Sequence, residues 1–315
     1  MRDIEAGLPM ERDSICRIYS MSKIVTSVAA LVLVEEARFK LDDPVGDYLP
    51  ELARMKVLAG GTAEKPLLAD ARHPITIKHL FTHTSGLTYD GDGSPVEKLN
   101  RDAKLPEATS LPDFVRRVSL LPLAFEPGEQ FSYSVSIDVL GALVEKVSGR
   151  PFGQFLEESL FRPLGMRDTG FSVPPAKMPR LAKTYEKGED GKLRPAKPVF
   201  GSEPGPGPKL EAGGAGLFST TGDYARFMQM LLNGGELDGV RILSRKTVEL
   251  MMANHLSHMA RTTHQFSEAD GFGLGGAVRI DLAKGNALGS VGQFGWSGAA
   301  TVLVALNHLW GCGLD

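Results

Sequence analysis

Ser20 and Lys23 lie three positions apart, a spacing that could do chemistry. On a helix this spacing places the lysine amine one turn from the serine hydroxyl, where it can help to remove the hydroxyl proton during acyl transfer. The Ser-x-x-Lys pattern is common by chance, so its place in the chain has to decide its meaning. The pair predicts a nucleophilic serine if a buried helix begins there.

A tyrosine in the middle of the chain is the second candidate. Tyr133 follows the turn that begins at Glu126-Pro-Gly and precedes a helical pattern. A tyrosinate beside the Lys23 ammonium could act as a general base toward Ser20. Without the first motif, a tyrosine packed in the core would be the better interpretation. We therefore predict Ser20, Lys23 and Tyr133 as one catalytic set.

A glycine-punctuated stretch near the end of the chain is the third candidate. It runs Gln293-Phe-Gly-Trp-Ser-Gly-Ala, and closely spaced glycines let a strand edge approach a substrate. We expect Trp296, Ser297 and Gly298 to contact the substrate. The backbone N–H of Ala299 would pair with that of Ser20 as an oxyanion hole.

The element that positions the first motif is a helix that follows a strand. Residues 15–19 alternate as in a strand, and residues 20–38 have helical spacing, with Ser20 at the start. Backbone N–H groups at a helix N-terminus can polarise an incoming carbonyl. Further helices are expected over 77–81, 111–118, 136–147, 152–161 and 221–232, and glycine-rich strands over 271–280 and 289–298.

Composition excludes several partners. The chain has 315 residues, of which 42% are hydrophobic and 23% charged, which is typical of a globular protein with a sizeable core. With a net charge of −3 and no basic cluster longer than Arg116-Arg117, we expect no nucleic-acid partner. The longest apolar stretch, from Ile24 to Val34, is far shorter than the roughly 20 residues of a membrane span. The acidic start of the chain lacks the features of a secretory signal, so we expect a cytoplasmic protein.

Metal and disulfide chemistry are also not expected. Cys16 and Cys312 lie in no metal-ligand spacing, and we expect two reduced thiols. His79 and His83 are four residues apart and could share a helix face, but no acidic third ligand lies at a motif spacing. We predict no metal and no other cofactor.

Several stretches together resemble the serine β-lactamase and penicillin-binding-protein superfamily, above all class C β-lactamases and family VIII carboxylesterases. The matching stretches span nearly the whole chain and include Tyr19-Ser-Met-Ser-Lys23, His79-Leu-Phe-Thr-His-Thr-Ser-Gly-Leu87, Phe131-Ser-Tyr-Ser134 and Gly295-Trp-Ser-Gly298. The resemblance implies that Ser20 is the acylated nucleophile and that Lys23 and Tyr133 handle its proton. Trp296 would occupy the start of the family's Lys-Thr-Gly-type strand motif.

Two departures from the lactamase pattern favour esters as substrates. Val135 stands where the lactamase motif resembles Tyr-x-Asn, and Trp296 replaces the lysine of the strand motif. Both remove polar groups that would bind a β-lactam amide or carboxylate, so we expect Val135 and Trp296 to contact a short-chain acyl ester instead. One alternative is hydrolysis of β-lactams or D-alanyl peptides. Another is a non-catalytic remnant or binding module.

The fold that the resemblance implies is α/β with a mainly helical second domain, an antiparallel sheet flanked by helices. Residues 1–19 and 210–315 would form the α/β part, and residues 20–209 the helical part, with a lid-like loop over 173–209 that is rich in Pro, Gly and Lys. Family members resemble one another in having further elements at both ends, so we expect a chain truncated by cloning or by a frameshift. Unpaired strand edges would then favour poor solubility or a homo-oligomer.

Overall fold

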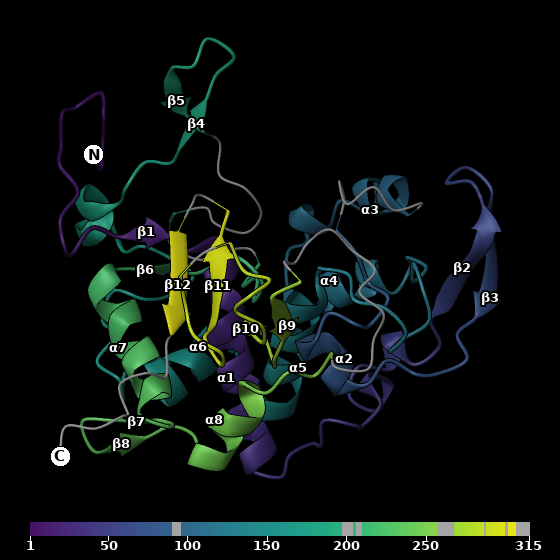
Figure 1. The fold of residues 1–315 in the computed structure, drawn as a ribbon. Helices are drawn as coiled ribbons and strands as arrows, with labels where there is room; N and C mark the ends of the chain where they lie inside the picture. Colours follow the sequence, from purple (N-terminus) through teal and green to yellow (C-terminus); the bar gives the residue numbers. More distant parts are fainter. Residues whose placement is uncertain are drawn as a thin grey trace.

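The fold combines an antiparallel four-stranded sheet with a body of helices packed around α1 (Ser22–Glu35), as Figure 1 shows. The structure is a computed structural model that describes residues 1–89, 96–196, 204–205, 210–256, 268–286, 288–299 and 302–306. The predicted class, an antiparallel sheet with many helices, is confirmed. The proposed division into two parts stays a prediction.

The helices of the described residues lie mostly where periodicity predicts them. Besides α1 they are α2 (Ile77–Phe81), α3 (Glu97–Ala103), α4 (Leu111–Val118), α5 (Ser136–Ser148), α6 (Phe152–Leu156), α7 (Thr221–Leu232) and α8 (Arg245–Met251). Caps explain the sharp boundaries: the Ser110 hydroxyl accepts from the Asp113 N–H at the start of α4, and the Thr220 hydroxyl accepts from the Asp223 N–H at the start of α7. α6 continues as a π-helical turn over Glu157–Phe161.

Within the described residues, the strands form one larger sheet and four small pairs. The large sheet has the order β12 (Val302–Leu306), β11 (Phe294–Gly298), β10 (Ala277–Arg279), β9 (Asp270–Phe272). The pairs are β1 (Cys16–Arg17) with β6 (Phe218–Ser219), β2 (Lys56–Gly61) with β3 (Pro66–Asp70), β4 (Tyr185–Lys187) with β5 (Leu193–Pro195), and β7 (Glu236–Leu237) with β8 (Val240–Arg241). All of these pairings are antiparallel.

α1 is the central element because its sequence is apolar on every side. All residues from Ser22 to Leu31 are buried, which is what an all-round apolar helix requires. It packs against α5, whose apolar residues join the same hydrophobic core. The regular α-helix begins two residues after Ser20, which lies in a 3-10 turn over Tyr19–Met21. The predicted nucleophile therefore lies in the turn that leads into α1.

Two hairpins, β2–β3 and β4–β5, form in parts of the sequence for which no strand is predicted. The β2–β3 hairpin projects from the body in Figure 1, and Leu67 and Leu68 are exposed on it, so it lacks the alternation that marks a half-buried strand. The β4–β5 hairpin lies inside the predicted lid. Residues 197–203 and 206–209 of that lid lie outside the described residues.

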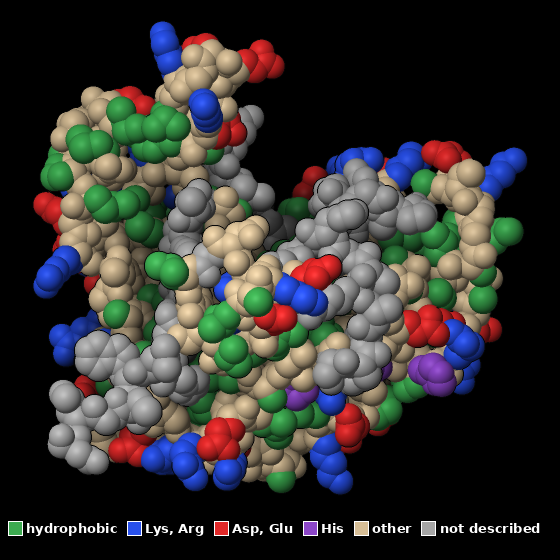
Figure 2. Space-filling view, in the orientation of Figure 1, with side chains coloured by type: hydrophobic (Ala, Val, Ile, Leu, Met, Phe, Trp, Pro, Cys, Tyr) green, Lys and Arg blue, Asp and Glu red, His purple; other side chains and the backbone are tan. Residues whose placement is uncertain are grey.

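The surface carries both signs of charge. On the face in Figure 2, Lys and Arg side chains alternate with Asp and Glu, and the surface is hollowed between the β4–β5 arm and the part that carries α3. None of the described helices has both the length and the apolar character that crossing a bilayer would require.

Candidate active site

The Ser20 hydroxyl lies between the two other predicted catalytic groups. Its Oγ accepts hydrogen bonds from Tyr133 OH at 2.7 Å and from Lys23 Nζ at 3.2 Å. Ser20 and Tyr133 are half-buried, whereas Lys23 is 1% exposed. A hydroxyl in this position can lose its proton to Tyr133 acting as a tyrosinate, with the Lys23 ammonium beside both oxygens.

The turn that carries Ser20 is anchored on both sides. The Ile18 N–H donates to the Leu217 carbonyl at 3.1 Å, and the Tyr224 hydroxyl of α7 donates to the Met21 carbonyl at 3.0 Å. Tyr19 has a φ of 45°, a left-handed conformation that costs free energy in a non-glycine residue. Such strain next to a nucleophile persists only where the surroundings enforce it.

Lys23 is a buried cation with partners on several sides. Besides Ser20, its ammonium donates to the Gly214 carbonyl at 2.7 Å. It also lies 4.6 Å from the ring centroid of Tyr133 and 5.5 Å from that of Tyr89, within the range of cation–π attraction. These contacts compensate part of the cost of removing the charge from water.

Tyr133 is held by its neighbours in sequence and by aromatic rings. The Ser132 N–H donates to the His83 carbonyl at 2.9 Å, and the Ser134 N–H donates to His83 Nδ1 at 3.2 Å. The His83 ring packs against Tyr133 with centroids 4.8 Å apart. On the other side Trp296 Nε1 donates to Tyr133 OH at 3.1 Å, so the phenol oxygen accepts from Trp296 and donates to Ser20.

β11 contains most of the glycine-punctuated stretch that begins at Gln293, and it packs against the turn of Ser20. Gly298 lies so close to Ile18 that a Cβ on it would be 2.5 Å from the Ile18 carbonyl oxygen. Ser297 and Ala299 are exposed beside it. This placement is compatible with an oxyanion hole formed by the N–H groups of Ser20 and Ala299, which stays a prediction.

Two predicted substrate contacts have different surroundings in the structure. Val135 is 2% exposed and belongs to the main hydrophobic core, so its side chain is not available to a substrate. It precedes α5, and the apolar contacts of that helix bury it. Trp296 is half-buried, and its indole N–H donates a hydrogen bond to Tyr133 OH.

Sequence reasoning missed Asp138 and Tyr89, which lie behind Lys23. Asp138 is fully buried, and its Oδ1 accepts from the Gly214 N–H at 2.8 Å. Burial raises the pKa of Asp138 to about 6, although the Lys23 ammonium lowers it. Burial and the Asp138 carboxylate raise the pKa of Tyr89. One signal was available: Asp138 is the single charged residue in the apolar stretch from 135 to 144.

A buried polar network of His83 and three serines lies next to Tyr133. His83 Nδ1 contacts Ser134 Oγ at 3.1 Å, Ser134 Oγ contacts Ser136 Oγ at 2.7 Å, and Ser136 Oγ contacts Ser85 Oγ at 2.8 Å. Burial lowers the pKa of His83, so its ring is neutral. α2 ends at Phe81 and His83 has a φ of 54°, so His79 and His83 do not share a helix face.

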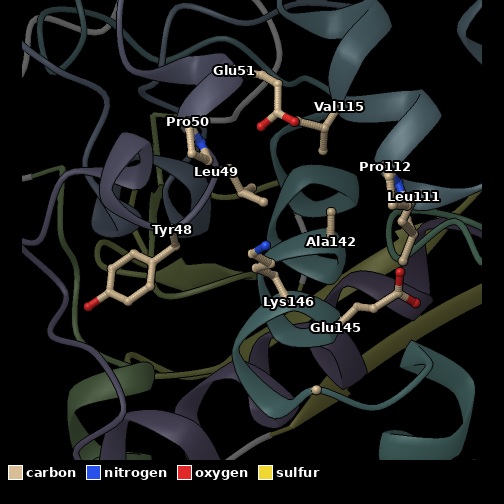
Figure 3. Close-up of a pocket in the computed structure, with 11 residues that line it drawn as sticks. Tyr48, Leu49, Pro50, Glu51, Leu111, Pro112, Val115, Ala142, Glu145 and Lys146 are labelled. Atoms are coloured by element: carbon tan, nitrogen blue, oxygen red, sulfur yellow. The ribbon is translucent and has the colours of Figure 1, made fainter.

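A separate cavity of about 340 Å³ lies along the second half of α5, away from the turn of Ser20 (Figure 3). Leu49, Leu111, Val115 and Ala142 are among its apolar lining residues, with Glu145 and Lys146 also at its wall. In the described ranges no three His, Cys, Asp or Glu side chains come together as metal ligands. Cys16 is a free thiol, and Cys312 lies outside the described residues.

Comparisons with known proteins identify the family of the chain. The family model described as Beta-lactamase matches residues 1–308. Protein Rv1367c of Mycobacterium tuberculosis is 39% identical over 307 residues, 95% of this chain and 75% of that protein. Esterase EstB of Burkholderia gladioli is 35% identical over 257 residues, 73% of this chain and 60% of the esterase.

Solved structures share the fold. The structure titled "EstCE1, a hydrolase with promiscuous acyltransferase activity" has a TM-score of 0.77 and 29% identity, and the match covers 98% of this chain and 83% of that one. The matched span of residues 1–308 includes the motifs around Ser20, Lys23 and Tyr133. The chain belongs to the β-lactamase family of serine hydrolases and acyltransferases.

Proposed function

We propose that this protein hydrolyses short-chain acyl esters through an acyl-enzyme on Ser20. The observation that carries the proposal is the position of Ser20 Oγ, 2.7 Å from Tyr133 OH and 3.2 Å from Lys23 Nζ. Similarity to the esterase EstB supports the ester as substrate. No cofactor takes part in the proposed reaction.

The proposed reaction has two transfers. Ser20 Oγ attacks the ester carbonyl while its proton passes to Tyr133 acting as a tyrosinate beside the Lys23 ammonium, and the oxyanion is held by the N–H groups of Ser20 and Ala299. The same proton then goes to the leaving alkoxide. In the second transfer the Tyr133 tyrosinate takes a proton from a water that attacks the acyl group, and the proton then goes to Ser20 Oγ as the carboxylic acid leaves.

Trp296 favours esters over β-lactams. Its indole N–H donates to Tyr133, and by the family resemblance it occupies the position of the lysine in the lactamase motif. A site without that cation loses a polar contact for the carboxylate of a β-lactam. EstCE1 is a hydrolase with promiscuous acyltransferase activity, which supports an alcohol as a second acyl acceptor, in place of water, in this chain as well.

The test compares the wild type with Ser20→Ala and with Ser119→Ala, a control serine whose hydroxyl donates to the Arg116 carbonyl next to α4. We expect the Ser20 variant to lose p-nitrophenyl butyrate hydrolysis by at least about 1000-fold, because acylation needs the nucleophile. Mass spectrometry after treatment with a fluorophosphonate should find the label on Ser20 in the wild type and in the control.

The other outcomes separate the alternatives. Rapid colour change of nitrocefin with slow ester turnover would favour a β-lactamase. Formation of butyl butyrate when butanol is added would add acyl transfer to the activity. A folded wild type with neither turnover nor label would contradict the proposal and favour a non-catalytic binding module.

A further inference from the structure

The buried carboxylate of Asp138 lies behind the ammonium of Lys23, and the Gly214 backbone lies between them. The Gly214 N–H donates to Asp138 Oδ1 at 2.8 Å, and the Gly214 carbonyl accepts from Lys23 Nζ at 2.7 Å. One residue of backbone therefore connects the acid and the amine.

The fit around Gly214 is tight. A Cβ on Gly214 would lie 2.4 Å from Asp138 Oδ2, so the carboxylate can pack here only against glycine. Thr26 Oγ1 donates to the neighbouring Gly213 carbonyl at 2.8 Å and attaches the same turn to α1. The turn over 213–214 thus has two anchors, one through Thr26 and one through Asp138.

The charge of Asp138 is otherwise unexplained. The side chain is fully buried; besides the Gly214 N–H, the Tyr89 hydroxyl is the polar group that interacts with the carboxylate, and in the described part of the chain Oδ2 has no further hydrogen-bond partner. Isolated buried carboxylates are costly and need a compensating positive charge. The titratable groups that face it are Lys23 from α1 and Tyr89 from the loop after α2, and of these only Lys23 is a cation.

We propose that Asp138 is the positioning residue and the counter-charge of Lys23: through Gly214 it fixes the ammonium beside Ser20, and its negative charge balances the buried cation. This inference rests on the proposed function, because it assigns a task to Lys23 in acyl transfer. Asp138 itself lies behind the reacting groups and does not touch the substrate.

The test uses three variants. Asp138→Asn keeps an oxygen for the Gly214 N–H but removes the charge, and Asp138→Ala removes both. Thr26→Val is the matched control, because it removes the other anchor of the turn and leaves the charge. With p-nitrophenyl butyrate we expect Asp138→Asn to lower kcat at least tenfold with KM within about twofold, because the amine stays near its place but its charge balance is lost.

The pH profile separates charge from packing. Burial raises the pKa of Asp138 to about 6, so wild-type kcat should fall as the pH drops through 6 and the carboxylate becomes neutral. Asp138→Asn should lack this acid limb, whereas Thr26→Val should keep it even if its melting temperature falls. The inference would be overturned if Asp138→Asn kept the kcat and the acid limb of the wild type. It would also be overturned if Thr26→Val lost the acid limb.

A double-mutant cycle of melting temperatures tests the pairing of Asp138 with Lys23 without any substrate. We expect Asp138→Asn to lower the melting temperature of the wild type, but to leave unchanged or raise that of Lys23→Met, where the carboxylate has lost its cation. Equal effects in both backgrounds would overturn the pairing. An inactive wild type that still shows this coupling would contradict the proposed function and leave the Asp138–Lys23 pair in place.

Discussion

The oxygen of Tyr133 is shared between Ser20 and Trp296, and this gives Trp296 a role that its position in the sequence does not suggest. A donor on the phenol oxygen stabilises negative charge there, which a general base needs. The indole also packs against Phe272, with ring centroids 5.4 Å apart. Trp296 should therefore act on the chemical step, through Tyr133.

Trp296→Phe should lower kcat by about 3- to 10-fold with an unchanged KM, because it removes one neutral hydrogen bond worth about 1 kcal/mol and keeps an aromatic ring. Steady-state kinetics with p-nitrophenyl butyrate measures both constants. Trp296→Leu, which also removes the ring, should cost more. A higher KM at unchanged kcat would instead favour direct contact between Trp296 and the substrate.

For single residues, the sequence predicts those contacts whose two partners lie close together along the chain. Ser20 and Lys23 are one turn apart on the same segment, so spacing alone places them together. Asp138 and Gly214 are 76 residues apart, and no spacing rule links them. Val135 was placed at the substrate from a motif position, but burial against the core decides where its side chain lies.

Among the elements, β11 packs directly against the turn of Ser20. Gly298→Ala should reduce kcat/KM about 10- to 100-fold, because the new Cβ would lie 2.5 Å from the Ile18 carbonyl oxygen and would push the strand away from Ser20. Rates of ester hydrolysis and of fluorophosphonate labelling both report the loss.

Gly170→Ala is the matched control for that strand. Gly170 also lies in a β-bridge, but a Cβ there would meet one neighbouring atom, at 3.9 Å. Its kinetics should stay within twofold of the wild type. An equally active Gly298→Ala would contradict the tight approach of β11 to Ile18.

Helices were easier to predict than hairpins. The predicted spans 111–118 and 221–232 agree with α4 and α7 because periodicity and a capping side chain mark each start. β2 and β3 carry exposed leucines, and β4 and β5 lie in a Pro- and Gly-rich stretch, so neither hairpin has an alternating pattern. Their pairing depends on partners that local patterns do not reveal.

For the whole molecule, buried histidines should make stability depend on pH. Burial lowers the pKa of His79 to about 4, below its unfolded value near 6.5. Between these values the unfolded chain binds a proton that the folded chain does not, so stability falls as the pH drops. Each such histidine contributes a slope of up to about 1.4 kcal/mol per pH unit.

His79→Gln tests this dependence without removing the helix cap. His79 Nδ1 accepts from the Thr76 N–H at the start of α2, and glutamine is a common residue at that position of a capping box. Urea unfolding between pH 6 and 4.5 should show a slope lower by up to about 1.4 kcal/mol per pH unit in the variant. An unchanged slope would mean that His79 is protonated in the folded protein.

The wide separation of the catalytic partners along the chain has a consequence for biosynthesis. Ser20 meets Tyr133 across 113 residues, Lys23 meets the Gly214 carbonyl across 191, and Tyr133 meets Trp296 across 163. Contacts of this kind form late, because long loops must close first. A nascent chain therefore completes the hydrogen bonds around Ser20 and Tyr133 only after β11 has left the ribosome and packed beside the turn of Ser20.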